Sequence, residues 1–152
     1  MASASLVTTV ILIRHGERNA PTPANPDPHL NAAGKARAKR LIHIVGQSGI
    51  KAIYRSHFAR AKETAQPLAT HLGLSVIEID EALQTKNDIL SNHAGQTVLV
   101  VGHSDTVPDI INRLGAGSLS LIDDSVFDNL FVIKVFGPGR ASMTRLKYGN
   151  QS

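Results

Sequence analysis

Two apolar runs, each followed within two residues by a histidine, constrain what this chain can fold into. Leu6–Ile13 and Thr97–Val101 are apolar or β-branched throughout, which predicts strands buried on both faces. Such strands belong to mostly parallel sheets that carry helices on either side. Arg14 and His15 follow the first run, and His103 follows the second. Because ligands bind beyond the carboxyl ends of parallel strands, we expect these side chains to converge at one edge of the sheet.

Helical and strand patterns alternate along the rest of the chain. The further predicted elements are a helix from the Asn31 N-cap to Ile44 or Val45, a strand at Ala52–Arg55, a helix at Ala59–Leu72, a strand at Leu74–Ile79, a weaker helix at Ala82–Asn92, a helix at Thr106–Leu114, and strands at Leu130–Phe136 and Ala141–Lys147. Asn19–His29 holds four of the seven prolines and is predicted to be a stiffened loop. We therefore predict one α/β domain over residues 1–152, a three-layer α/β/α sandwich with a mostly parallel central sheet and a C-terminal antiparallel hairpin.

The composition excludes several classes of protein. With 152 residues, 42% of them hydrophobic and 18% charged, the chain has the make-up of an ordinary globular domain. Cysteine is absent, which excludes disulfides, thiolate metal sites and cysteinyl-phosphate chemistry. No run approaches the roughly 20 apolar residues of a membrane span, and no basic region precedes the first apolar run as in a signal peptide. We expect a cytoplasmic protein with no membrane partner, whose oligomeric state the sequence does not determine.

The net charge of +4 at pH 7 raises the question of a nucleic-acid partner. Most basic residues are spread along the chain, and the one cluster has helical spacing, which predicts a solvated helix face. We therefore expect no nucleic-acid partner. A modest positive balance also suits an enzyme that attracts anionic substrates. The cluster consists of Lys35, Arg37, Lys39 and Arg40.

Four short segments carry the chemical signal, and their order along the chain is informative. They are Arg14-His15-Gly16-Glu17-Arg18, Leu30-Asn31-Ala32-Ala33-Gly34, the stretch from Ser56 to Ala65 that contains Arg60, and Val101-Gly102-His103-Ser104. Together they resemble the histidine phosphatase superfamily, also called phosphoglycerate-mutase-like, from about Val7 to Leu114. The resemblance implies a metal-independent phosphatase that needs no cofactor. The compact length resembles the short, SixA-like members of that superfamily.

The residue types themselves suit phosphoryl transfer. Arg14 and Arg60 are candidate phosphate ligands, because a guanidinium group matches phosphate bidentately and stays charged. His15 is the candidate nucleophile, since an imidazole nitrogen can form a covalent phospho-enzyme. Nearby arginine charges are expected to lower its pKa and keep it neutral, while its other ring nitrogen donates to a carbonyl. Gly16 is expected to let the backbone pass close to the phosphate.

The resemblance assigns further contacts around the phosphate. It implies that His103 donates a hydrogen bond to the phosphoryl group and stabilises its developing charge. Arg18 and Ser104 are candidate additional phosphate contacts, although Arg18 alone also fits a solvent-exposed residue. Ser56 is expected to make local hydrogen bonds, and His57 is expected to be a surface or turn residue.

The general acid that protonates the leaving group is less clearly marked. Relatives carry a glutamate after the third strand, where this chain has only Asp80 and Glu81. Asp105, two residues after His103, is our first candidate, and Glu81 is the second. Each also has a purely structural interpretation, because Asp105 is a suitable N-cap for the helix that follows and Glu81 suits the start of another.

The leading functional hypothesis is a phosphomonoesterase that acts through phospho-His15 on a phosphorylated small molecule or a phosphoprotein. With only Asn19–His29 as a lid, the pocket is expected to be shallow and open. The open pocket also raises a phosphohistidine-protein phosphatase in signalling as an alternative. A phosphoglycerate-type mutase and a non-catalytic phosphate-binding module are the remaining alternatives.

Overall fold

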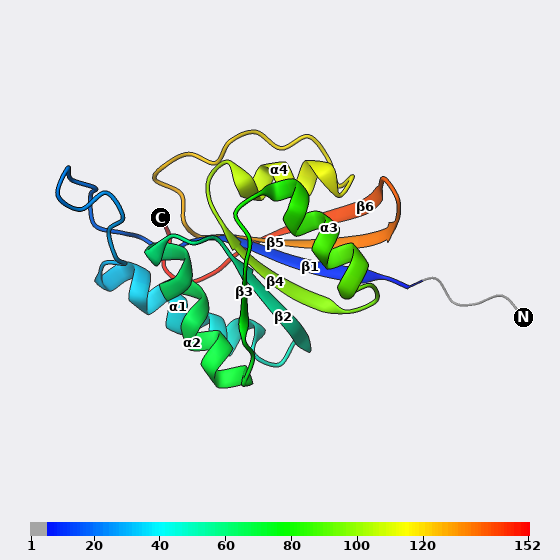
Figure 1. Cartoon of the computed structure of the whole chain (residues 1–152), viewed down its shortest axis with the longest axis horizontal. Helices are drawn as coiled ribbons and strands as arrows, with labels where there is room; N and C mark the ends of the chain where they lie inside the picture. The colour runs from blue at the N-terminus through cyan, green and yellow to red at the C-terminus, as the bar shows by residue number, and fades with distance from the viewer. Residues whose placement is uncertain (1–5) are drawn as a thin grey trace, which may run out of the picture.

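The computed structural model describes residues 6–152, in which strands and helices alternate before a final strand pair (Figure 1). The elements are β1 (Thr8–Arg14), α1 (Ala32–Val45), β2 (Ile50–Arg55), α2 (Ala59–Leu72), β3 (Val76–Glu78), α3 (Ala82–Asn92), β4 (Thr97–Gly102), α4 (Thr106–Arg113), β5 (Asn129–Gly137) and β6 (Arg140–Lys147). Every predicted element is present, with its ends moved by a few residues. Within residues 6–152, no helix has both the length and the apolar character needed to cross a membrane.

The six strands form one sheet in the order β3-β2-β4-β1-β5-β6. β1, β2, β3 and β4 run parallel, whereas β5 and β6 are antiparallel to their neighbours. β1 and β4 lie side by side in a register that pairs Arg14 with Gly102. The sheet therefore confirms the predicted mostly parallel centre and C-terminal antiparallel hairpin. It also brings the carboxyl ends of the two apolar runs to the same edge.

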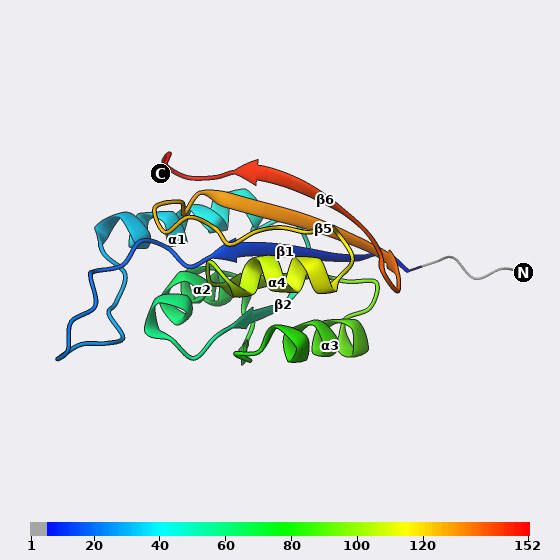
Figure 2. The same ribbon diagram turned by 90° about the horizontal axis from the view of Figure 1, so that it is seen from above.

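Helices cover both faces of the sheet (Figure 2). On one face, Leu41 of α1 and Leu68 of α2 belong to a buried cluster with alternate side chains of the central strands. On the other face, Ile89 of α3 and Ile110 of α4 pack into a second cluster. The continuous apolar sequence of β1 follows from this arrangement, because both of its faces are buried. The three predicted layers are confirmed.

The ends of the elements reflect local backbone chemistry. Asn31 accepts a hydrogen bond from the backbone N–H of Gly34 and begins α1, as predicted. Gly73 ends α2 in the left-handed conformation, with φ of 69°. β3 is shorter than the predicted Leu74–Ile79 strand, because it is an edge strand that pairs with β2 at only three positions.

The basic cluster is not a uniformly solvated face, and the prediction is wrong at Arg37. This side chain is 2% exposed, and its Nε donates to the carboxylate of Glu17 across 2.8 Å. Its Nη1 donates to the backbone carbonyl of Tyr148. Arg37 lies four residues before the buried Leu41, so helical geometry turns it toward the core. The exposed members of the cluster are Lys35, Lys39 and Arg40.

Candidate active site

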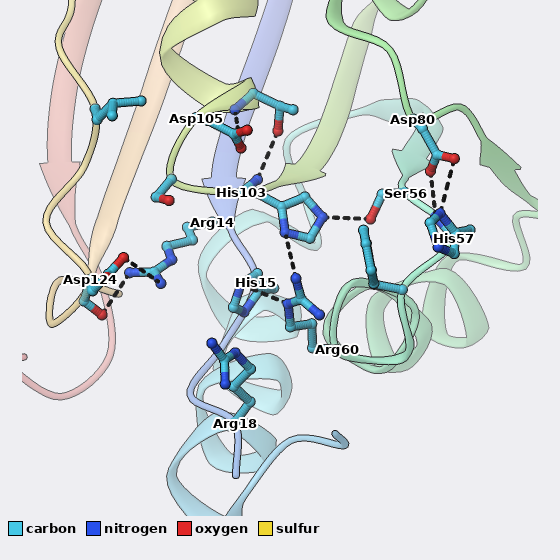
Figure 3. A pocket seen from close by; sticks show the side chains of 14 residues that line it. Arg14, His15, Arg18, Ser56, His57, Arg60, Asp80, His103, Asp105 and Asp124 are labelled. Carbon is cyan, nitrogen blue, oxygen red and sulfur yellow. Dashed lines mark hydrogen bonds and ion pairs between the residues drawn. The ribbon is translucent and has the colours of Figure 1, made fainter. Parts of the chain in front are cut away.

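A cavity of about 470 Å³ opens at the carboxyl ends of β1 and β4 (Figure 3). Its inner part, here called the floor, consists of Arg14, His15, Arg60 and His103. Its outer part, here called the rim, carries the exposed side chains of His57, Asp80, Asp105 and Asp124. The remaining lining residues are Arg18, Ser56, Phe58, Ser104, Thr106 and Leu121. The structure thus brings together the floor residues that the sequence singled out, with Arg18 and Ser104 beside them.

His15 is buried just beyond β1, with 2% of its surface exposed. Its Nδ1 lies 2.8 Å from the carbonyl oxygen of Gly16, which is an acceptor, so Nδ1 carries the ring proton. Arg60 Nε–H donates to His15 Nε2 across 3.2 Å, which requires a lone pair on Nε2. The neutral ring therefore presents Nε2 to the cavity as its unprotonated nitrogen.

Burial holds His15 in this neutral form. The pKa of His15 is lowered to about 3, chiefly because the imidazolium would be taken out of water. The positive charges of Arg14 and Arg60 lower it further, but less than burial does. We predicted the direction of this shift from the arginines alone. The larger cause is the depth at which the sheet edge buries the ring.

Arg14 is held by the segment that joins α4 to β5, residues 114–128, here called the strap. The Arg14 guanidinium lies 4.1 Å from the centre of the Phe127 ring. Its Nη1 donates to three strap carbonyls at 3.1, 2.9 and 3.1 Å, and its buried Nε has no hydrogen-bond partner within the described part of the chain. These bonds fix the guanidinium in one orientation and leave the donors on Nε and Nη2 without a hydrogen bond among residues 6–152. The three carbonyls belong to Asp123, Asp124 and Val126.

Arg60, at the start of α2, is positioned by an aromatic ring and by a carboxylate that lies far from it in the sequence. Its guanidinium lies 4.3 Å from the centre of the Phe58 ring. Asp27 Oδ1 lies 3.6 Å from Arg60 Nη1, and the Asp27 carboxylate also accepts the backbone N–H of Ala59. Phe58, at the N-cap position, has no side-chain acceptor for that N–H. Asp27 therefore caps α2 from 32 residues away.

His103 lies beside His15, with the two ring centres 5.1 Å apart. Its Nε2 is 2.6 Å from Ser56 Oγ, and its Nδ1 is 3.5 Å from Arg60 Nη2. Since an arginine can only donate, Nδ1 is unprotonated and the Nε2–H donates to Ser56. The pKa of His103 is lowered to about 4, first by burial and then by the Arg60 charge. Ser56 therefore orients a floor histidine, a role we did not predict for it.

Two glycines allow α1 to support the loop that follows β1. A Cβ on Gly34 would lie 2.1 Å from the carbonyl oxygen of Glu17, and one on Gly16 would lie 3.0 Å from Gly34 Cα. The close approach that Gly16 permits is thus to α1, whereas we predicted an approach to phosphate. The Gly16 N–H donates to Thr64 Oγ1 across 2.9 Å. These contacts hold the backbone on either side of His15 against α1 and α2.

The two candidate general acids differ in their positions. Asp105 lines the cavity, but its carboxylate accepts the Thr106 N–H at 2.8 Å and caps α4. Glu81 is exposed at the start of α3 and is not part of the cavity lining. Asp80 does line the cavity, where it binds His57. Among residues 6–152, no three His, Asp or Glu side chains are grouped as a metal site.

The segment that borders the cavity mouth is not the predicted one. No residue of the Asn19–His29 loop lines the cavity, and Figure 1 shows this loop extending away from the sheet. Instead, the strap contributes Leu121 and Asp124. Sequence reasoning missed the strap, because it contains no helix or strand and no motif. Its length between α4 and β5 was the only signal available.

Comparisons with known sequences point to one protein family. A sequence model of the histidine phosphatase superfamily (branch 1) matches residues 10–86, a stretch that holds His15 and Arg60. An uncharacterized protein of Mycobacterium tuberculosis (strain CDC 1551 / Oshkosh), MT0547, is 32% identical over 92 residues, which cover 58% of this chain and 46% of that protein. The matches span less than half the length of the curated relatives.

Solved structures share the fold at low sequence identity. The protein histidine phosphatase SixA complexed with tungstate superposes with a TM-score of 0.73 at 17% identity, covering 91% of this chain and 96% of SixA. A mycobacterial glucosyl-3-phosphoglycerate phosphatase gives a TM-score of 0.73 at 13% identity, covering 94% of this chain and 100% of that one. At such identities the likeness concerns the fold alone.

Proposed function

Because the family match covers half of its length, this chain belongs to the histidine phosphatase superfamily (branch 1), and we propose that it is a phosphomonoesterase acting through phospho-His15. The observation that carries the proposal is the floor itself. One nucleophilic nitrogen, two guanidinium groups and a second imidazole face a single cavity. This set of groups fits a phosphate dianion and its transfer.

In the first step, we propose that the substrate phosphate takes the hydrogen bond that Arg60 Nε makes to His15 Nε2. Release of that bond frees the lone pair on Nε2 for attack on phosphorus. The P–N bond forms as the ester P–O bond breaks, and the electron pair of that bond leaves with the ester oxygen. The Nδ1–H bond to the Gly16 carbonyl stabilises the positive charge that develops on the ring.

The other floor residues stabilise the charge on the three equatorial oxygens. Arg14 Nε is a buried donor that has no hydrogen-bond partner among the residues that the structure describes, so binding phosphate costs it none of the bonds seen there. A bound dianion favours protonation of His103, which then donates from Nδ1. Arg18 and Ser104, both in the cavity lining, add further phosphate contacts in this scheme. Water then attacks phospho-His15 and returns the ring to its starting form.

Two kinds of substrate fit the cavity, a phosphorylated small molecule and a phosphoprotein. The exposed rim favours a phosphohistidine protein as the second candidate, since no residue of the Asn19–His29 loop lines the cavity. Turnover of a phosphohistidine-bearing domain should then be faster than that of small esters, and the reverse ranking favours a small-molecule substrate.

A mutase requires phosphate transfer from a bisphosphate to a second sugar-phosphate acceptor, and measuring that transfer is a direct assay for this alternative.

The decisive experiment compares wild type with His15→Ala on 4-nitrophenyl phosphate in the presence of a chelator. We expect wild-type turnover, a loss on the order of 10⁴-fold in the variant, and an acid-labile phosphoenzyme in wild type only. His71→Ala, an exposed histidine of α2 outside the cavity, is the matched control. Equal activity in wild type and His15→Ala contradicts the proposal. Tight phosphate binding without turnover identifies a non-catalytic module instead.

A further inference from the structure

His57 and Asp80 form a hydrogen-bonded pair on the rim of the cavity (Figure 3). His57 lies between β2 and α2, and Asp80 follows β3. One carboxylate oxygen of Asp80 accepts the backbone N–H of His57 at 2.8 Å, and the other lies 2.9 Å from His57 Nδ1. Two contacts to one carboxylate fix both the backbone and the ring. They place the Nδ1 proton toward Asp80, and Nε2 is the nitrogen left for other chemistry.

The pair lies one aromatic ring away from the floor. The His57 ring packs on Phe58 with their centres 4.0 Å apart, and Phe58 meets His103 edge-on at 5.2 Å. The Arg60 guanidinium also lies over Phe58. His57 is therefore held at the outer side of the phosphate-binding groups, and its side chain is 52% exposed. His57 lines the same cavity as the floor residues, so a group attached to a phosphate bound on the floor would leave the cavity past this rim.

Two of the carboxylates that line the cavity, Asp80 and Asp105, already accept hydrogen bonds from the protein. The His57 backbone N–H holds the pKa of Asp80 below its usual value, so Asp80 stays ionised at neutral pH. Asp105 accepts the Thr106 N–H at the start of α4, so one of its carboxylate oxygens is engaged as the helix cap. An imidazole differs, because it exchanges a proton nearest to neutral pH of all side chains. A carboxylate bound at one ring nitrogen fixes which nitrogen is left to transfer a proton.

We propose that His57, oriented by Asp80, is the proton donor to the leaving group. This inference rests on the phosphatase function proposed above. As the ester P–O bond breaks, its electron pair stays on the departing oxygen, which takes the proton from His57 Nε2. The neutral His57 then accepts a proton from water as that water attacks phospho-His15. The P–N bond breaks, its electron pair returns to His15 Nε2, and both histidines regain their starting states.

The test exploits the fact that good leaving groups need no acid. We compare kcat/KM for 4-nitrophenyl phosphate, whose leaving group departs readily as the anion, with kcat/KM for benzyl phosphate, whose alkoxide requires a proton. In His57→Gln, we expect benzyl phosphate hydrolysis to fall on the order of 10²-fold or more. Hydrolysis of 4-nitrophenyl phosphate should change by less than about threefold, because the floor is untouched. Asp80→Asn should show the same selectivity with a smaller loss.

Two further variants make the outcome interpretable. His71→Gln is the matched control and should leave both rates unchanged, because this exposed residue lies outside the cavity. Asp105→Asn tests the other candidate acid. The inference is overturned if His57→Gln slows both substrates equally, if it slows neither, or if Asp105→Asn alone shows the selective loss. If wild type does not hydrolyse 4-nitrophenyl phosphate at all, the proposed phosphatase function itself fails. If wild type is active but His57→Gln shows no selective loss, only the proton-donor inference fails. The two failures are therefore distinguishable.

Discussion

The floor and the rim of the cavity are built in different ways. Floor side chains are buried or half-buried, and Arg14 alone donates to three backbone carbonyls. Rim side chains are exposed and belong to short connections or to the strap. Buried charged groups are costly to disturb, whereas exposed ones are screened by water and salt. If the proposed function holds, the buried floor at the sheet edge binds the phosphate, and the exposed rim on the connections contacts the leaving group.

Among the predictions that compare the floor with the rim, the largest effect should come from removing a floor charge. Arg60→Ala should lower kcat/KM for 4-nitrophenyl phosphate on the order of 10³-fold, because it deletes donors to the transition state. Arg60→Lys should recover only part of this loss, since an ammonium keeps the charge but not the planar fork. Steady-state kinetics measure both. Lys62→Ala, which removes an exposed cation from the same helix, is the control and should stay within twofold. A similar loss in Lys62→Ala would mean that kcat/KM depends on the overall positive charge of the protein and not on the floor in particular.

A smaller effect should appear in the pH dependence of stability. The pKa of His15 is about 3 in the folded protein, against about 6.5 in the unfolded chain. Between these values the unfolded state binds the extra proton, so the free energy of unfolding falls as pH decreases below about 6.5. The loss is about 1.4 kcal/mol per pH unit, or roughly 2 kcal/mol by pH 5.

His15→Asn lacks this ionisation and serves as the comparison. Urea unfolding of both proteins at pH 7 and pH 5 should show that the wild type loses about 2 kcal/mol more than the variant between the two pH values. The other titrating groups are common to both proteins and cancel in this difference. If both proteins lose the same stability, burial does not keep His15 neutral, and the floor is more hydrated than the structure indicates.

The smallest effect should come from the rim carboxylate on the strap. Asp124 is 98% exposed, and its Oδ1 lies 4.0 Å from Arg14 Nη2. Asp124→Asn removes a negative charge at the mouth, so the KM for a dianionic substrate should fall about twofold at low salt and be unchanged at high salt. Steady-state kinetics at two ionic strengths measure this change. A loss of kcat on the order of tenfold or more would make Asp124 part of the floor.

Much of the fold followed from patterns that are local in the sequence. The apolar runs of β1 and β4, the Asn31 cap and the turn at Gly73 each depend on a few neighbouring residues. The prediction was wrong at Arg37. A charged residue indicates a solvent-exposed position, whereas helical geometry turns this side chain toward the core. It also assigned the cavity mouth to the proline-rich loop, although the strap borders the mouth instead.

The sequence by itself determined the order of strands and helices and the residues that make up the floor, because periodicity, caps and short motifs act over a few neighbouring positions. Only the tertiary structure decided what holds those residues in place. The strap carbonyls that bind Arg14 lie more than 100 residues from it, and the carboxylate that binds His57 lies 23 residues away. Which donor meets which acceptor over such separations depends on how the layers pack. For the same reason, burial of His15 at the sheet edge, rather than the adjacent arginine, decides its pKa.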